Sequence, residues 1–205
     1  MDHAPTDESL FEKYRKGDLA SFRALIDRHH DELLHFLIRL VGDRQAAEDV
    51  FQETFLQIHQ SASGFDVQRR FRPWMFTIAA NKGRDYLRRK NRRKTVDLSA
   101  PVFSSDDGGM EYVDLMAINV PTPDAAMDQR ETSAQVQQAL EGLSPALREI
   151  LLLSYFQRLS YAQIADDLNI PLGTVKSRLH AAVAAFAKNW KKVTTDRTEE
   201  APKSS

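Results

Sequence analysis

The sequence predicts an all-α protein made of two small helical domains joined by a flexible acidic linker. Three observations lead to this fold class. Apolar residues recur at helical spacing along most of the 205-residue chain, and signals for β-strands are almost absent. A stretch rich in serine, glycine, proline and acidic residues, 94–122, interrupts the helical pattern. Because loops of that length are uncommon inside a compact domain, this one is expected to separate two domains.

Composition removes several classes of protein. The chain has no cysteine, which excludes a disulfide framework and any cysteine zinc site. No apolar run approaches the length of a membrane span, and the start, with Asp2, Asp7 and Glu8, does not resemble a signal peptide. The sequence therefore predicts a cytoplasmic protein without membrane insertion.

The first domain is predicted to be a set of amphipathic helices. Large apolar residues keep helical spacing through residues 10–41. Gly42 suits a helix end, and Asp43 suits the N-cap of the next helix, which is expected to reach about His59. After a loop rich in serine and glycine, Pro73 falls in the first turn of a long helix that continues to the linker.

In the second domain the helical pattern resumes near Asp124 and pauses at Gly142. Further on, Ser160 and Gln163 have the spacing of a capping box, in which each side chain caps the other's backbone. The polar residues 193–205 are expected to be a disordered tail.

Charge is strongly segregated along the chain. Residues 69–94 carry 11 Lys/Arg against one Asp/Glu, whereas residues 95–141 carry one against nine. A basic block is usually a solvated face, but one mixed with aromatic residues favours a polyanion such as DNA as partner.

Residues 160–186 predict a helix–turn–helix, with the turn at 169–171. On the second helix one face is apolar and packs: Val175, Leu179, Ala182 and Phe186. The other face is small and polar, with Thr174 at the helix start and Lys176 and Arg178 on opposite flanks: Gly173, Ser177, His180, Ala181 and Ala184. Small residues let the backbone approach a major groove, and flanking cations meet phosphates. A plain helical hairpin is the alternative, and the unit alone indicates only DNA binding.

Three segments together resemble one protein family. They are AEDVFQETF (47–55), FRPWMFTIAANKGRDYLRRKNRR (71–93) and LSYAQIADDLNIPLGTVKSRLHAA (159–182). They are similar to regions 2 and 4 of bacterial RNA polymerase sigma factors of the extracytoplasmic-function type. The resemblance implies region 2 at 8–93, a linker at 94–122, region 4 at 123–192 and a tail at 193–205. It also implies an initiation factor rather than an enzyme. Such a factor binds core RNA polymerase, directs it to specific promoters, melts the minus-10 region and needs no cofactor.

The helix at 45–59 is the expected contact with core polymerase. Its outward face combines one leucine with carboxylates and an amide: Asp49, Gln52, Glu53 and Leu56. Such a face suits a partner helix rich in arginine, and a solvated acidic face is the alternative. The resemblance points to the clamp helices of the largest polymerase subunit for this face and to the flap region for region 4. An anti-sigma factor is a further candidate partner.

The loop and long helix after this face are expected to bind and melt the minus-10 element. They supply rings, hydrogen-bond donors and cations: Phe65, Asp66, Trp74, Asn81, Lys82, Arg84, Arg88 and Arg89. Single strands are held by stacking and backbone charge, and an unpaired base is read on its edge. For Trp74 and Ile78 a place in the core is the competing interpretation.

Recognition of the upstream, minus-35 element is assigned to Gln163 and to five residues of the second helix: Thr174, Lys176, Ser177, Arg178 and His180. This chain departs from the family pattern at two positions. Gln163 stands where glutamate is usual, and His59 stands where tryptophan is common. Because of Gln163, the sequence preference at the upstream element is not predicted. Because of His59, the packing around that position is not predicted.

The sequence also bears on a metal site, on a different class of DNA-binding protein and on the role of the linker. Glu32 and His35 have metal-ligand spacing, but no second pair matches them, so no metal site is predicted. A DNA-binding response regulator or repressor that never contacts polymerase is the main alternative. The acidic linker is either a plain spacer or a segment that lies in the positively charged channel of the polymerase.

Overall fold

The computed structural model describes residues 4–66, 69–95, 129–157 and 159–200, and every regular element within them is helical. The all-α prediction is therefore confirmed. The first group of helices is α1 (Asp7–Arg15), α2 (Leu19–Val41), α3 (Arg44–Ser61) and α4 (Phe71–Thr95). The second is α5 (Gln129–Glu141), α6 (Pro145–Leu151), α7 (Tyr161–Leu168) and α8 (Leu172–Glu200). Linker residues 96–122 and the expected helix start near Asp124 lie outside the described residues.

Local capping fixes the boundaries of α2 and α3. The Asp18 carboxylate accepts a hydrogen bond from the backbone N–H of Ala20 at 3.0 Å, which begins α2. Gly42, with φ of 80°, ends α2 in the left-handed conformation that glycine adopts without strain. Asp43 then begins α3 by accepting from the N–H of Ala46 at 2.8 Å. The predicted end at Gly42 and N-cap at Asp43 are both confirmed.

The first half of the molecule packs around α2 and α4. Large buried side chains from α2, such as Leu33 and Leu37, meet Phe71 and Met75 of α4 in one apolar core. Near the end of α2 the two helices approach very closely. A Cβ added at Gly83 would lie 2.5 Å from the side chain of Leu40, so any larger residue here would force that side chain to move.

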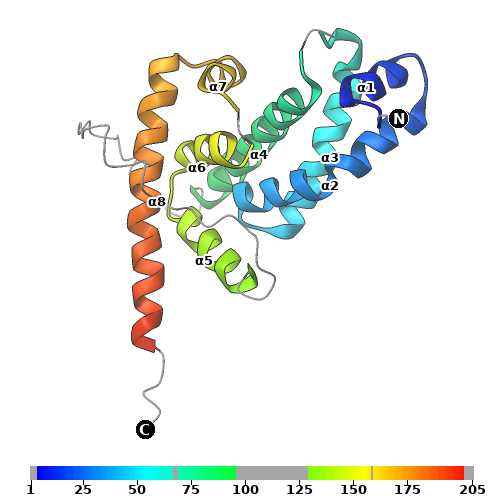
Figure 1. Ribbon diagram of the computed structural model, residues 1–205. Helices are drawn as coiled ribbons and strands as arrows, with labels where there is room; N and C mark the ends of the chain where they lie inside the picture. Colours follow the sequence, from blue (N-terminus) through cyan, green and yellow to red (C-terminus); the bar gives the residue numbers. More distant parts are fainter. Residues whose placement is uncertain (1–3, 67–68, 96–128, 158, 201–205) are drawn as a thin grey trace.

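The second half packs around α8, which Figure 1 shows as a long helix with α5, α6 and α7 along it. A short π-helix (Leu152–Phe156) follows α6 directly. The predicted packed face of α8 is confirmed, because each of its members is buried: Val175, Leu179, Ala182 and Phe186.

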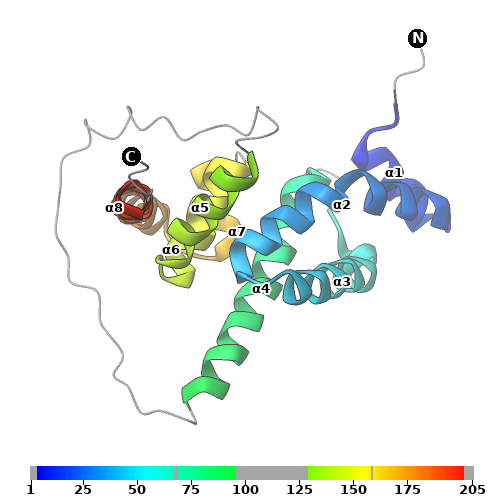
Figure 2. The same cartoon turned by 90° about the horizontal axis from the view of Figure 1, so that it is seen from below.

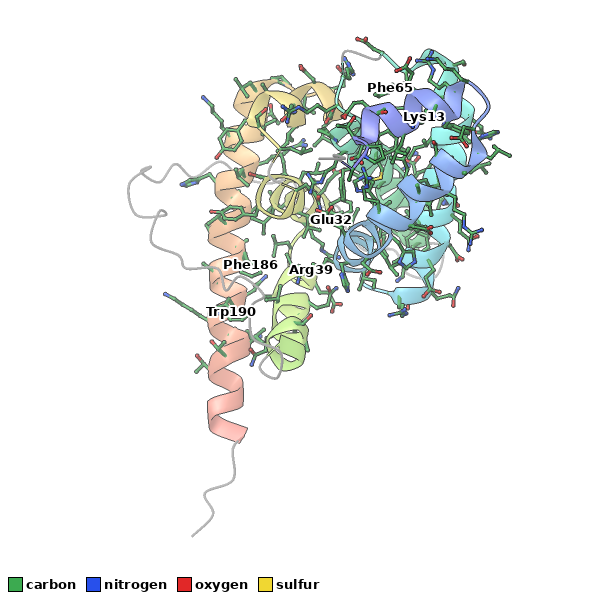
Figure 3. The ribbon with its side chains drawn as sticks, turned by 45° about the vertical axis from the view of Figure 1, so that its right-hand side comes forward. Lys13, Glu32, Arg39, Phe65, Phe186 and Trp190 are labelled. Atoms are coloured by element: carbon green, nitrogen blue, oxygen red, sulfur yellow. The ribbon has the colours of Figure 1, made fainter. Side chains whose placement is uncertain are left out.

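The C-terminal segment corrects one expectation. Residues 193–200 continue α8 as helix, although the sequence was expected to be disordered from 193. No glycine or proline lies between Gly173 and Pro202, so nothing in the backbone stops the helix. Trp190 stacks on Phe186, with ring centroids 6.1 Å apart, which anchors the middle of α8 (Figure 3).

The two halves are in contact, which the sequence did not predict. α4 packs against α6 and α7, while α2 packs against α6 and the π-helix. The buried guanidinium of Arg148 on α6 donates to the carbonyl oxygen of Leu40 at 3.0 Å, at the C-terminal end of α2. It also donates to three carbonyl oxygens at the end of α5 and just beyond it: Leu140, Glu141 and Leu143. One side chain thus joins the ends of two helices from different halves.

Candidate nucleic-acid and protein interfaces

One face of α3 is exposed and carries an apolar residue among polar ones. Asp49 and Gln52 are exposed, and Leu56 keeps 56% of its surface accessible, whereas Val50 on the opposite face is buried. Figure 2 shows α3 on the side of the first half that is turned away from α5 and α6. The predicted outward face is therefore accessible for a partner.

Glu53 lies on that face, but its carboxylate already interacts with another residue of the chain. Its carboxylate lies 3.5 Å from the guanidinium of Arg89 on α4, and each side chain remains more than two-fifths exposed. The structure therefore places Arg89, which was assigned to DNA, beside the predicted protein-docking helix.

A hollow of about 460 Å³ opens beside the loop that joins α3 to α4. Its lining combines hydroxyls, a carboxylate, a guanidinium and two aromatic rings: Ser61, Ser63, Gly64, Phe65, Asp66, Arg69 and Trp74. Arg15 of α1 donates to the carbonyl oxygens of Ser63 at 3.3 Å and Phe65 at 3.4 Å, which ties the loop to the first helix. The hollow therefore has one wall fixed by packing.

The two aromatic residues of that wall are held in the core. Phe65 is buried, with its ring 4.5 Å from that of Trp74 and 5.1 Å from that of Phe11 in α1. Figure 3 shows Phe65 beside α1. Trp74 is half-buried in the same cluster, and Ile78 packs partly against the core. Trp74 and Ile78 pack against the core but remain partly exposed, and the Phe65 ring is packed rather than extended into solvent.

The basic residues of α4 have different surroundings. Arg88 is exposed and pairs with Asp85 one turn away at 3.0 Å. Asn81 and Lys82 are half-buried. Arg84 instead forms a two-point ion pair across the two halves with Glu149 of α6.

The helix–turn–helix is built from α7 and α8. The predicted capping box is present, because the N–H of Ser160 donates to the Gln163 side chain at 2.9 Å and the reverse bond is 3.2 Å. Asn169 makes the turn in the left-handed conformation, with φ of 51°. On α8 the residues Lys176, Ser177 and Arg178 are exposed, while Thr174 and His180 are half-buried.

Two acidic residues at the contact between the halves were missed by the sequence reasoning. Burial raises the pKa of Glu149, against the lowering effect of the nearby Arg84. Burial also raises the pKa of Asp167 on α7, against the lowering effect of the nearby Thr77 hydroxyl of α4, and one oxygen of this carboxylate is buried without a hydrogen-bond partner. In the sequence Glu149 stands directly before the apolar run ILLL at 150–153, and this position could have indicated that the residue is buried.

The possible metal ligand Glu32 has a different partner. Its carboxylate pairs with Arg72, and Figure 3 shows it between α2 and the second half. Across the described ranges no group of three or more histidines or acids could hold a metal ion. In the same residues no helix has the length and apolar character that crossing a membrane requires.

Comparison with known proteins shows the family. The Sigma-70 region 2 family matches residues 25–93, and the Sigma-70 region 4 family matches residues 133–186. The ECF RNA polymerase sigma factor SigW of Bacillus subtilis is 32% identical over 85% of this chain and 91% of its own length. SigL of Mycobacterium tuberculosis is 39% identical over 83% and 89%. The chain belongs to the ECF sigma factors. As such it directs RNA polymerase to specific promoters.

Solved structures show the same fold. The sigma factor RpoE of Bartonella quintana, in complex with the anti-sigma factor NepR, has a TM-score of 0.59 and 22% identity and covers 83% of this chain. CnrH, in complex with the cytosolic domain of CnrY, has a TM-score of 0.60 at 22% identity and covers 89%. The region 2 match spans most of α2, all of α3 and most of α4, and the region 4 match spans most of α5, all of α6 and α7 and the first part of α8.

Proposed function

We propose that this sigma factor, acting in the cytoplasm and without catalytic activity of its own, uses three separate surfaces. The α3 face binds core polymerase, the hollow with α4 binds and melts the minus-10 element, and α8 reads the minus-35 element. In this assignment region 2 spans 8–93 and region 4 spans 123–192. The observation that carries the proposal is the hollow, because a polar-lined cavity beside a basic helix suits an extruded base.

The α3 face is the proposed docking site for the polymerase clamp helices. Leu56 offers apolar surface at the centre and Asp49 offers charge to a basic partner. Burying the exposed part of a leucine contributes about 1 kcal/mol, so Leu56→Ala should weaken binding about fivefold. Adding Asp49→Arg should abolish it, because a cation then faces a basic surface.

The docking test uses purified core polymerase and fluorescence anisotropy of the labelled full chain. Asp27→Arg is the matched control, since Asp27 is an exposed carboxylate of α2 that makes only a 4.0 Å contact with Arg23. If Asp49→Arg with Leu56→Ala binds core polymerase as tightly as this control, the docking surface lies elsewhere. Failure of the wild-type chain to bind core polymerase would favour a repressor.

The hollow is proposed to take a base that leaves the duplex when the minus-10 element opens. Asp66 and Ser63 could hydrogen-bond its edge, and Arg69 could meet the adjoining phosphate. Asp66→Ala should therefore lose selectivity among single-stranded minus-10 sequences, measured with holoenzyme and a randomised pool.

Melting is tested separately from base selection. Open-complex formation is followed by permanganate reactivity on a duplex promoter and on the same promoter with a pre-opened bubble. A base-reading role predicts that Asp66→Ala remains impaired on the bubble template. Full rescue by the bubble would show that Asp66 acts on melting and not on recognition.

Region 4 is proposed to bind the upstream duplex through the start of α8 and to contact the polymerase flap. Lys176, Ser177 and Arg178 are exposed on one turn of this helix and suit base and phosphate contacts. An anti-sigma factor is a proposed regulator, supported by the solved RpoE structure, in which a protein of the same fold is bound to one. Selection of genomic fragments by the reconstituted holoenzyme tests promoter recognition and yields the two sequence elements.

A further inference from the structure

α1 contacts both ends of the loop that joins α3 to α4 and lines the minus-10 hollow. At the first end Arg15 donates to the carbonyl oxygens of Ser63 at 3.3 Å and Phe65 at 3.4 Å. At the other end the backbone N–H of Phe71, the first residue of α4, donates to the carboxylate of Glu8 at 3.0 Å. One helix therefore holds the loop where it leaves α3 and where it enters α4.

One face of α1 makes these contacts. Glu8, Phe11 and Arg15 are three and four residues apart, so they lie in one row along the helix. Phe11 is buried, with its ring 5.1 Å from that of Phe65 and 5.0 Å from that of Phe71. Figure 3 shows Phe65 against α1. A polar contact thus stands at each end of the row, and an aromatic contact lies between them.

α1 is itself fixed to the neighbouring helices. Near its start, Asp7 accepts a hydrogen bond from Arg28 of α2 at 2.7 Å, and its other carboxylate oxygen lies 2.9 Å from the Nε2 atom of His29. Near its end, the hydroxyl of Tyr14 hydrogen-bonds the ring of His59 on α3. The position of α1 is therefore set by helices outside the loop. The region 2 match begins within α2, so α1 lies outside the matched residues.

The loop needs this support because its own first turn is weakly closed. The N–H of Phe65 donates to the carbonyl oxygen of Ala62 at 3.4 Å, which is long for such a bond. Ser63 and Asp66, which are proposed to read the extruded base, lie within two residues of Phe65. A pocket that has its binding geometry in only part of the molecules binds with an affinity reduced by that fraction. Contacts from α1 therefore raise the affinity for the base that fits the pocket.

We propose that α1 is a positioning element for base selection: Arg15 and Glu8 fix the two ends of the loop, so that Ser63 and Asp66 face the extruded base in a constant geometry. This inference rests on the proposed base-reading role of the hollow. Arg15 and Glu8 act through the loop and need no contact with DNA. Their loss should lower the preference for the correct base, while binding to core polymerase is kept.

The test measures base preference with the reconstituted holoenzyme. A pool of single-stranded oligonucleotides is randomised across the minus-10 element, and bound and free sequences are counted. Arg23→Ala is the matched control for Arg15→Ala, because Arg23 is an exposed arginine of α2 that lies 4.0 Å from Asp27. Arg15→Ala should reduce the preference about threefold to tenfold, the change that corresponds to one net hydrogen bond, at the base position that Asp66→Ala also affects. The control should keep the wild-type preference.

Base preference separates a positioning role from a merely structural one. Unfolded molecules bind no sequence, so a lower folded fraction changes the amount of DNA bound but cancels in the ratio between two sequences. If Arg15→Ala lowers the free energy of unfolding in urea but keeps the wild-type preference, α1 only stabilises the domain and the proposal is overturned. Glu8→Gln retains an oxygen that can accept from the N–H of Phe71, so it should keep most of the preference that Glu8→Ala loses. Equal losses in these two variants would refute the role of Glu8.

A double-mutant cycle separates failure of the positioning role from failure of the proposed function. If both residues act on the same base contact, Arg15→Ala should add little loss of preference in the Asp66→Ala background. The same loss in both backgrounds would mean that Arg15 acts independently of the pocket, and would overturn the positioning role. A changed preference in Asp66→Ala with none in Arg15→Ala would refute the positioning role and leave the hollow as the base site. An unchanged preference at every position in Asp66→Ala would refute the hollow itself, and the positioning role with it.

Discussion

Replacing Arg148 by methionine tests how much one buried guanidinium contributes to the fold. Its four hydrogen bonds run to carbonyl oxygens at the ends of two helices: Leu140, Glu141, Leu143 and Leu40. A bond from a charged donor contributes about 1.5–3 kcal/mol. Burial opposes this gain, as the lowered pKa of Arg148 shows. The net loss on removal should be about 1–3 kcal/mol, the cost of leaving buried carbonyl oxygens without their donor.

The loss should be unequal between the domains, because three of the four acceptors belong to region 4. The chain has two tryptophans, and each reports one domain: Trp74 lies in region 2 and Trp190 on α8. Urea unfolding is followed by fluorescence in two single-tryptophan backgrounds, Trp74→Phe and Trp190→Phe. Arg148→Met should lower the region 4 transition by the full amount and the region 2 transition by about 1 kcal/mol, for one bond.

Arg148→Lys is the matched control. It keeps the charge but loses the planar fork that reaches several acceptors at once, so its effect should fall between wild type and Arg148→Met. A loss below about 1 kcal/mol at region 4 would refute the role of the side chain as a common cap for two helix ends. Equal losses in both backgrounds would show that the domains unfold as one unit.

Three further predictions concern recognition, pH and packing. Ser177→Ala with His180→Ala should remove about 1–3 kcal/mol of discrimination at each base pair read by these side chains, measured by competition between upstream sequences; unchanged discrimination would rule them out. Burial raises the pKa of Asp7, but hydrogen bonds from His29 and a neighbouring arginine outweigh it and hold the pKa below its usual value. The stabilisation that Asp7 gives to the folded chain should therefore be complete at pH values above the usual pKa of an aspartate and should be lost as the pH falls through the lowered pKa. Asp7→Asn should remove this pH dependence of the free energy of unfolding, measured by urea titration. Gly83→Ala should cost about 1–3 kcal/mol, because its new methyl group meets a side chain of α2, and a neutral result would show that α2 shifts easily.

Local signals in the sequence were enough to predict most helix boundaries. The caps at Asp43 and Ser160 need only residues within one turn, so their spacing in the sequence determines their geometry. The C-terminal boundary was harder. The polar composition after residue 192 suggests disorder, but composition does not stop a helix that lacks glycine and proline and is anchored by Trp190.

The candidate surfaces could be predicted from the sequence where a single helix face forms the whole surface. The exposed α3 face around Leu56 and the packed side of α8 follow from helical periodicity alone. The partners of Arg84 and Arg89 did not follow, because the acidic residues that bind them come from other elements. Phe65 is a similar case, since only the contact with α1 shows that the ring is packed. Charge composition predicted that α4 is basic, but not which of its cations already have partners.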